Sequence, residues 1–176
     1  SVTGVQTCAL PISDVAWAVC ARNQRDGERY RARLDWHVDV ETWLPELVVV
    51  PRPGQSEADS AAKAVRPGVI NVYDRGLQSF QLIAAHFTVD GPRVHSHADF
   101  VMRLREEGSN AITLLLVEDK PLTKAACAAR VTCDRLVEVP GLQHRHGFYA
   151  VLREVVVALP DGKPLRLLTT LCDLPA

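Results

Sequence analysis

One aspartate stands where a metal-binding carboxylate is often found. The short apolar run Val69–Tyr73 ends abruptly in Asp74, Arg75 and Gly76. A continuous apolar run suggests a strand buried on both faces of an α/β sheet, and ligands tend to bind beyond the carboxyl ends of such strands. A carboxylate held there is suited to a divalent metal ion. The alternative is structural: Asp74 caps the next helix or pairs with Arg75.

Two His-x-His pairs, His95 with His97 and His144 with His146, form a second candidate site, for zinc. Both pairs are close to Gly or Pro, and neither has a cysteine or carboxylate at a matching spacing. We therefore expect them to lie in solvated loops.

The stretch Ala21–Arg33 contains five arginines, a composition suited to DNA phosphates. Asp26 and Glu28 dilute its positive charge. A solvated hairpin or loop is therefore an equally good reading of this stretch.

The elements around Asp74 are predicted in the order β-β-α-β-α-β. Ser56 and Ser79 are suitable N-caps for the two helices, and Glu57 and Asp59 fall in the first turn of the former. This order predicts an α/β core with an antiparallel hairpin at its start. The predicted elements are strands 29–40 and 43–50, helix 56–65, strand 69–73, helix 79–87 and strand 98–105.

Beyond Gly108 the chain becomes β-rich. Turn signals such as Pro140-Gly141 and Asp161-Gly162 separate its apolar segments. We read this part as a second, mostly antiparallel unit. Its predicted strands lie within 111–119, 130–139, 148–159 and 163–174, with a short helix at 122–130.

Composition describes a globular protein. The chain has 176 residues, of which 47% are hydrophobic and 23% charged. It has no apolar run long enough to cross a bilayer, so we expect a soluble, cytoplasmic protein without a membrane partner. The net charge of -1 gives no global attraction to nucleic acid. Five scattered cysteines without a C-x-x-C pair indicate reduced thiols.

The segments YDRGLQSFQLI and HADFVMRLREEGSNA resemble the central signature of bacterial insertion-sequence transposases of the IS-four group, members of the DDE superfamily. In that family an Asp-Arg-Gly-Tyr block ends a buried strand, and a later strand reads roughly Phe-Val-x-Arg-Leu. Leu77 stands where tyrosine is usual, and Phe80 replaces another aromatic residue. The matching residues are Asp74, Arg75, Gly76, Phe100, Val101, Arg103 and Leu104.

The resemblance covers Asp14–Ala176 and implies an α/β fold. We expect a partial ribonuclease H-like core at 14–107, a mixed sheet with flanking helices, and a β-rich insertion subdomain at 108–176. The full enzyme would bind double-stranded DNA, both transposon ends and target, and catalyse nicking and strand transfer with two Mg²⁺ or Mn²⁺ ions. It would act as a homodimer in the bacterial cytoplasm, at the nucleoid.

The resemblance assigns a catalytic, metal-binding role to Asp74, as the second of three acids. Arg75 and Arg103 become candidate DNA contacts, although a structural salt bridge explains Arg75 equally well. Asp35 and Asp39 share one face of a predicted strand, and we expect polar edge residues there rather than the first acid.

The other two acids of the family are expected outside this sequence. The first would fall within or before residues 1–13, and the final glutamate in a Tyr-Arg-Glu helix beyond Ala176. The segment Val2–Ile12 resembles the translation of a sequencing adapter, so residues 1–13 are expected to be an artefact, and their pattern predicts no particular structure. The chain is then a central fragment, truncated at both ends and inactive alone. The alternatives are another ribonuclease H-like nuclease, or a non-catalytic DNA-binding or structural relic.

Overall fold

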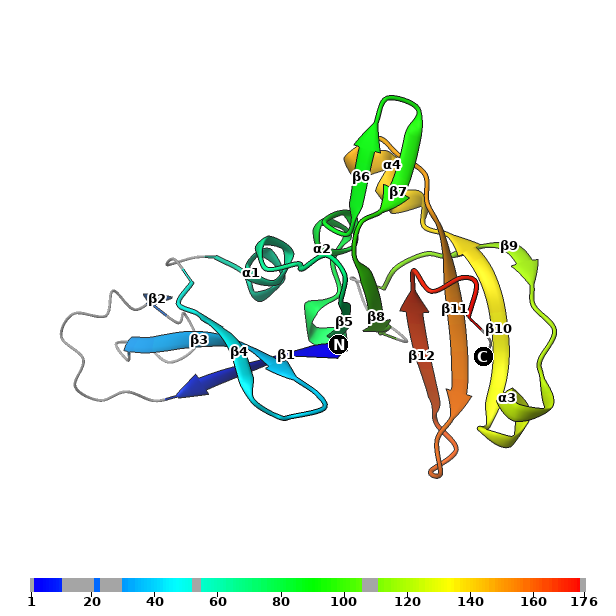
Figure 1. The fold of residues 1–176 in the computed structure, drawn as a ribbon, viewed down its shortest axis with the longest axis horizontal. Helices are drawn as coiled ribbons and strands as arrows, with labels where there is room; N and C mark the ends of the chain where they lie inside the picture. Colours follow the sequence, from blue (N-terminus) through cyan, green and yellow to red (C-terminus); the bar gives the residue numbers. More distant parts are fainter. Residues whose placement is uncertain (1, 11–20, 23–29, 52–54, 106–110, 175–176) are drawn as a thin grey trace.

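The computed structural model of the chain describes residues 2–10, 21–22, 30–51, 55–105 and 111–174 (Figure 1). Much of the arginine-rich stretch, residues 23–29, lies outside the described residues. No described helix is long and apolar enough to cross a membrane.

Ten of the described strands form one mixed sheet in the order β2-β3-β1-β5-β8-β12-β11-β10-β9, with β4 paired to β3 (Figure 1). Parallel pairing is confined to β1 with β5 and β5 with β8, and the other pairs are antiparallel. The strands are β1 (Val2–Leu10), β2 (Ala21–Arg22), β3 (Tyr30–Asp39), β4 (Pro45–Val49), β5 (Ile70–Tyr73), β8 (Asp99–Arg103), β9 (Leu115–Asp119), β10 (Val131–Glu138), β11 (Val151–Ala158) and β12 (Pro164–Thr169).

Short helices connect these strands. The helices are α1 (Glu57–Lys63), the 3₁₀ turn η1 (Arg75–Leu77), α2 (Phe80–Ala84), α3 (Lys124–Ala128) and α4 (Pro140–His146). Ser56 and Ser79 are N-caps, as predicted, and Ser56 forms a complete capping box with Asp59. The caps confirm where α1 and α2 begin.

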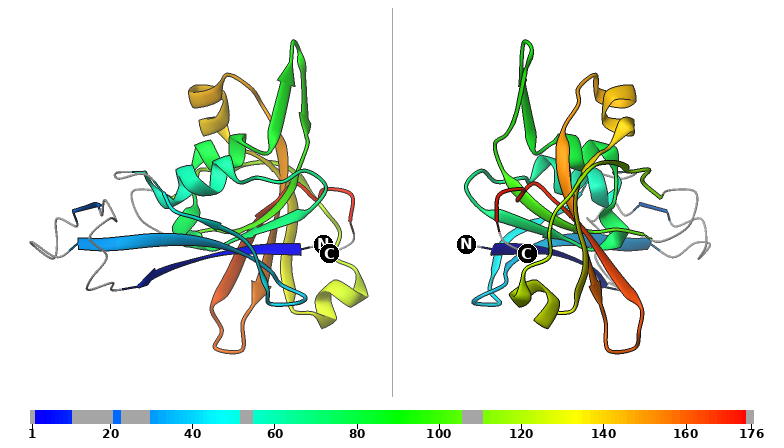
Figure 2. Two further views of the ribbon diagram at one scale, coloured as in Figure 1. Left: turned by 60° about the vertical axis from the view of Figure 1, so that its left-hand side comes forward. Right: turned by 90° about the vertical axis from the view of Figure 1, so that its right-hand side faces the viewer.

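A hairpin that the sequence did not predict follows α2. Strands β6 (Phe87–Asp90) and β7 (Arg93–Ser96) pair only with each other among the described strands and project from the rest of the molecule (Figure 2). The predicted helix 79–87 is therefore too long, because the chain leaves the helix after Ala84 and Phe87 begins β6. Gly91, with φ of 56°, supports the tight turn of this hairpin.

The hydrophobic core lies between one face of the sheet and the helices α2 and α4. Phe100 and Met102 of β8 are fully buried, as are Leu82 and Ile83 of α2 and Leu142 of α4. This core extends without a break from β5 across β8, β12 and β11 to β10. The region predicted as a separate β-rich unit, 108–176, therefore shares both sheet and core with the region before it. The domain boundary at 107 stays a prediction.

The first strand differs from expectation. The sequence pattern assigned no element to residues 1–13, but Val2–Leu10 form β1 between β3 and β5. Periodicity was a poor guide because a central strand gains its stability from pairing on both sides rather than from its own pattern. The adapter origin of this segment stays a prediction.

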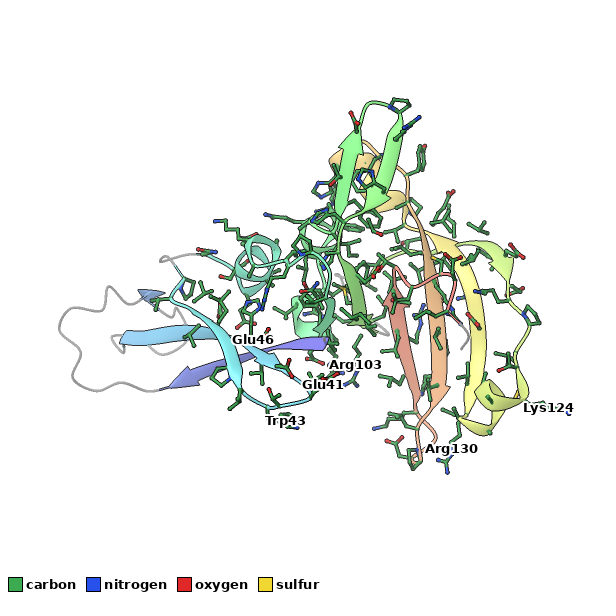
Figure 3. All side chains as sticks on the ribbon, in the orientation of Figure 1. Glu41, Trp43, Glu46, Arg103, Lys124 and Arg130 are labelled. Carbon is green, nitrogen blue, oxygen red and sulfur yellow. The ribbon has the colours of Figure 1, made fainter. Side chains whose placement is uncertain are left out.

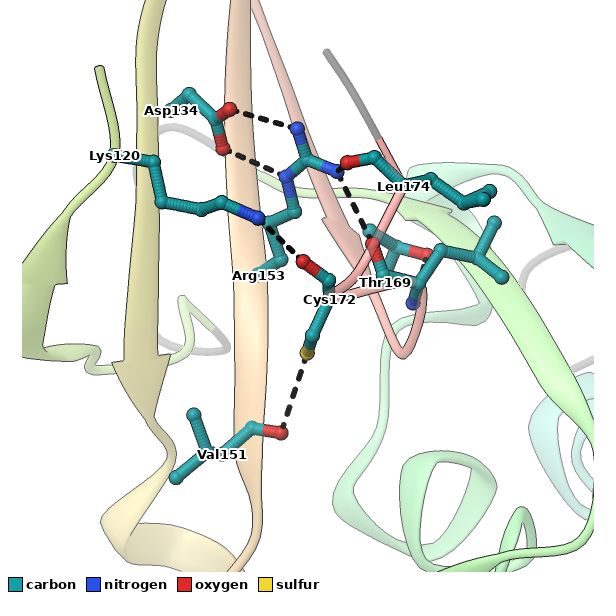
Figure 4. A network of polar contacts seen from close by, with 8 residues as sticks. Lys120, Asp134, Val151, Arg153, Thr169, Cys172 and Leu174 are labelled. Carbon is teal, nitrogen blue, oxygen red and sulfur yellow. Dashed lines mark hydrogen bonds and ion pairs between the residues drawn. The ribbon is translucent and has the colours of Figure 1, made fainter.

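The last described segment is fastened to the sheet by polar contacts (Figure 4). The guanidinium of Arg153 donates to both carboxylate oxygens of Asp134 at 2.7 Å, and each of these side chains is about 3% exposed. Arg153 also donates to the carbonyls of Leu171 and Leu174. The ammonium of Lys120 donates to the carbonyl of Cys172. These contacts tie residues 171–174 to β10 and β11.

The Asp74 site

Asp74 lies directly after β5, beside the end of β8. Tyr73 of β5 is in register with Met102 of the parallel strand β8, so Asp74 and Arg103 stand at the next level. A guanidinium nitrogen of Arg103 lies 3.9 Å from Oδ1 of Asp74. The side chains are 41% and 65% exposed, respectively, so solvent reaches both partners of this ion pair.

Asp74 also starts the turn that follows it. Its Oδ2 accepts a hydrogen bond from the main-chain N–H of Gly76 at 3.4 Å, and its carbonyl accepts one from Leu77 at 3.0 Å. Asp74 therefore caps the 3₁₀ turn η1, whereas the predicted helix that follows is capped by Ser79. The ion-pair partner is Arg103, not the Arg75 that the structural alternative named.

Three arginines lie on the two segments that meet at Asp74. Arg75 is exposed on η1, and Arg103 reaches Asp74 from β8. Arg105 follows β8, and its guanidinium donates to the carbonyls of Arg75 at 2.9 Å and Gly76 at 3.3 Å. The structure thus brings together the three predicted site residues, Asp74, Arg75 and Arg103, and adds Arg105.

A buried polar pair supports the end of β5 from the core side. The Tyr73 hydroxyl lies 3.1 Å from Nε2 of His86, and Nδ1 of His86 lies 2.9 Å from the carbonyl of Leu82. Since a carbonyl only accepts, Nδ1 carries the proton and Nε2 accepts from the tyrosine. Burial lowers the pKa of His86 to about 4 and raises the pKa of Tyr73. His86 is therefore neutral at pH 7 and holds β5 against α2.

Asp74 is the candidate metal ligand at this place. Asp74 offers the oxygen ligands that Mg²⁺ prefers. Among the described parts of the chain, no three His, Cys, Asp or Glu side chains are grouped closely enough to hold a metal ion. Asp74 fits one position in a coordination shell and does not complete it.

The strand next to β5 carries no acid at the corresponding level. Gly4 of β1 pairs with Val72, and the same register continued by two residues brings Gln6 level with Asp74. The segment Val2–Leu10 contains neither Asp nor Glu. The adapter-like segment thus occupies the strand position beside Asp74.

The two aspartates of β3 have different surroundings. Asp39 ends the strand, and its Oδ1 accepts hydrogen bonds of 2.9 Å from the N–H groups of Glu41 and Thr42. Asp35 is only 2% exposed, within a strand that pairs with β1 and β4. The prediction of a polar edge residue is therefore wrong for Asp35, because β3 is not an edge of the sheet.

The sequence suggested that both histidine pairs lie in loops, but three of these four histidines lie in a strand or a helix. His95 belongs to β7 with His97 just beyond it, and His144 and His146 form the last turn of α4. All four side chains are exposed. His97 Nδ1 is 3.1 Å from the Thr88 hydroxyl, a contact across the β6–β7 hairpin.

Three of the five cysteines have described side chains. Cys127, Cys133 and Cys172 are free thiols, as predicted for them. Burial raises the pKa values of Cys133 and Cys172, so both thiols are protonated at neutral pH.

Sequence reasoning missed Arg105 and the Tyr73–His86 pair. Arg105 follows Arg103 by two residues, but no spacing rule predicts that its guanidinium reaches back to a turn 30 residues earlier. His86 fell within the predicted helix 79–87, and nothing in the pattern singled it out. Only the fold brings these side chains to β5.

In sequence, no protein-family model matches the chain, and no curated protein matches it. In structure, the chain is similar to a piggyBac transposase determined by cryo-EM in a synaptic complex with hairpin DNA. The TM-score is 0.52 at 12% sequence identity, over 99% of this chain and 34% of that one. The chain thus has a transposase-like fold and spans about a third of the length of that transposase.

Proposed function

We propose that this chain is the central part of a DDE transposase of the IS-four group, with a ribonuclease H-like core. The observation that carries the proposal is the position of Asp74, exposed at the carboxyl end of a central parallel strand and paired with Arg103 of the next strand. The transposase-like fold supports the same assignment. The mixed sheet with helices packed on its core face is consistent with the proposed core.

The residues of the site divide into two roles under this proposal. Asp74 is one oxygen ligand of a Mg²⁺ or Mn²⁺ pair, and the remaining acids come from outside the described residues. When bound, such ions stabilise the attacking and leaving oxygens of a phosphodiester displacement. Arg75 and Arg103 contact the phosphates of double-stranded DNA, at transposon ends and target, in a homodimeric enzyme of the bacterial cytoplasm.

DNA binding by this chain is the direct test. Fluorescence anisotropy with a labelled duplex, repeated from 50 to 200 mM salt, gives the affinity and its salt dependence. Each phosphate contact contributes about 0.9 to the slope of log K against log salt concentration. We expect Arg75→Gln and Arg103→Gln each to lower that slope by roughly one. Lys124→Gln is the control, because Lys124 lies on α3, far from Arg103 (Figure 3).

The outcomes separate the proposal from its rivals. Slopes lowered by the two arginine variants, with the Lys124 variant unchanged, support DNA contact at the Asp74 site. Equal effects of all three variants indicate non-specific attraction and contradict a dedicated surface. Absence of duplex binding at 50 mM salt contradicts DNA contact by this chain altogether and favours a structural relic.

A further inference from the structure

Arg105 joins the end of β8 to the turn that carries Asp74. Its Nε donates to the carbonyl of Arg75 at 2.9 Å, and its Nη2 donates to the carbonyl of Gly76 at 3.3 Å. These are the two residues that follow Asp74 in the chain. One guanidinium thus holds two consecutive carbonyls of the same turn.

A third contact completes this connection. The main-chain N–H of Arg105 donates at 2.8 Å to the side-chain oxygen of Gln78, the C-cap of η1. Gln78 is 8% exposed, so this hydrogen bond lies at the edge of the core. Arg105 therefore contacts the turn at its beginning, its middle and its end.

The turn itself is held weakly by its own hydrogen bonds. It is a single 3₁₀ turn, and two of its internal contacts are long, Gln78 N–H to Arg75 O and Gly76 N–H to Asp74 Oδ2, both 3.4 Å. Hydrogen bonds of this length are weak, because N–H···O distances in proteins are usually about 2.7–3.2 Å. Since the N–H of Gly76 touches the Asp74 carboxylate, a displacement of the turn displaces the carboxylate as well.

We propose that Arg105 is a positioning residue for Asp74, which acts by fixing the 75–78 turn on the end of β8. This inference rests on the proposed function, since it assigns Arg105 to the same site. The role requires arginine because the two carbonyls need donors that diverge from one planar group. Lysine, a single ammonium on a flexible chain, can hold one carbonyl well and the other poorly.

Two-dimensional NMR of the ¹⁵N-labelled chain tests this role without catalysis. The first readout is hydrogen exchange at the Leu77 amide, which donates to the Asp74 carbonyl. The second is Mn²⁺ titration, in which paramagnetic broadening of the Gly76 amide reports a metal ion at Asp74, with Asp74→Asn as the blank. The variants are Arg105→Gln and Arg105→Lys, and Arg93→Gln, exposed on β7, is the matched control.

We expect Arg105→Gln to speed Leu77 exchange by roughly five- to tenfold, as the loss of one or two ordinary hydrogen bonds would. We expect it to weaken Mn²⁺ binding severalfold, and Arg105→Lys to restore part of both effects. Arg93→Gln should change neither. Partial rescue by lysine separates positioning from general destabilisation.

Two results have distinct meanings. Leu77 exchange in Arg105→Gln equal to that of the unmodified chain overturns the positioning role, whatever the metal does. Absence of Asp74-dependent broadening in the unmodified chain contradicts metal binding under the proposed function, while Leu77 exchange still decides whether Arg105 holds the turn. If Arg105→Gln does not fold, the same exchange comparison is made with Arg105→Lys.

Discussion

Asp74 and Arg103 stand side by side because their strands run parallel and in register. Tyr73 is level with Met102, so the next residue of each strand places a carboxylate 3.9 Å from a guanidinium. The pair lies at the carboxyl ends of both strands, where an α/β sheet offers its ligand sites. Because the pair is exposed, a ligand can reach it, and it contributes little to the free energy of unfolding.

We predict that breaking this pair changes stability little. Exposed ion pairs contribute about 0–1 kcal/mol, so Asp74→Asn and Arg103→Gln should each shift the free energy of unfolding by less than about 1 kcal/mol. Urea denaturation followed by circular dichroism measures this. A loss of several kcal/mol for either variant would show that the pair serves folding rather than a site.

The chain alone should not cleave DNA efficiently. Asp74 belongs to no group of three or more His, Cys, Asp or Glu side chains among the described residues, and a two-metal centre needs several carboxylate ligands. Incubation of a supercoiled plasmid with the chain and Mg²⁺ should leave the plasmid intact on an agarose gel. Cleavage that disappears with Asp74→Asn would contradict this prediction and show that the chain holds the remaining ligands.

A buried carboxylate of β11 should carry far more of the stability than Asp74. Glu154 is fully buried and accepts 2.6–2.7 Å contacts from Arg135 of β10 and Arg166 of β12. Glu154→Ala leaves two half-buried cations without a partner, which costs about 3–5 kcal/mol in comparable buried pairs.

The matched control is Glu118→Ala, because Glu118 is exposed on β9. Surface changes of this kind stay within about 0.5 kcal/mol. Both unfolding free energies come from the same urea titration. A Glu154 variant as stable as the Glu118 variant would mean that the arginines find other partners or water.

The titration of His86 should make the chain less stable as the pH is lowered. Its pKa is about 4 in the folded chain and about 6.5 when unfolded. Between these values the unfolded chain binds a proton that the folded chain does not. The unfolding free energy therefore decreases as pH falls from 6.5 to 4, by roughly 3 kcal/mol from this group.

Urea denaturation midpoints, measured from pH 7.5 down to 4.5, check this dependence. The unmodified chain is compared with His86→Gln, which lacks the titrating imidazole. His37 has a pKa lowered by burial as well, so the variant should retain part of the slope. Identical pH dependence in the two proteins would mean that folding does not lower the pKa of His86.

Much of the fold near Asp74 could be predicted because local signals and tertiary structure agree there. The N-caps Ser56 and Ser79, the strand before Asp74 and the strand through Phe100 all appear as expected. The sequence also placed Asp74, Arg75 and Arg103 together, through the resemblance rather than through periodicity.

Most of the rest depends on tertiary contacts that no local pattern encodes, and one helix was missed although its caps are local. Val2–Leu10 become a strand through pairing with β3 and β5, and Pro140–His146 become α4 where turn residues predicted a loop. Pro140 fits the first helical position and Gly147, with φ of 77°, the C-cap, so capping rules could have identified α4. Arg105 could not be found this way, because its partners lie on another element.

The packing of α4 on α2 gives the last prediction. A Cβ at Gly141 would lie 2.1 Å from a ring carbon of Phe80, on which Arg145 also stacks at 4.8 Å. Gly141→Ala must displace that ring and should cost about 1–3 kcal/mol as overpacking does. Adding Phe80→Leu should recover part of the loss, since the shorter side chain vacates the contact. Thermal unfolding of the single and double variants measures both effects, and additive losses without recovery would contradict a direct clash.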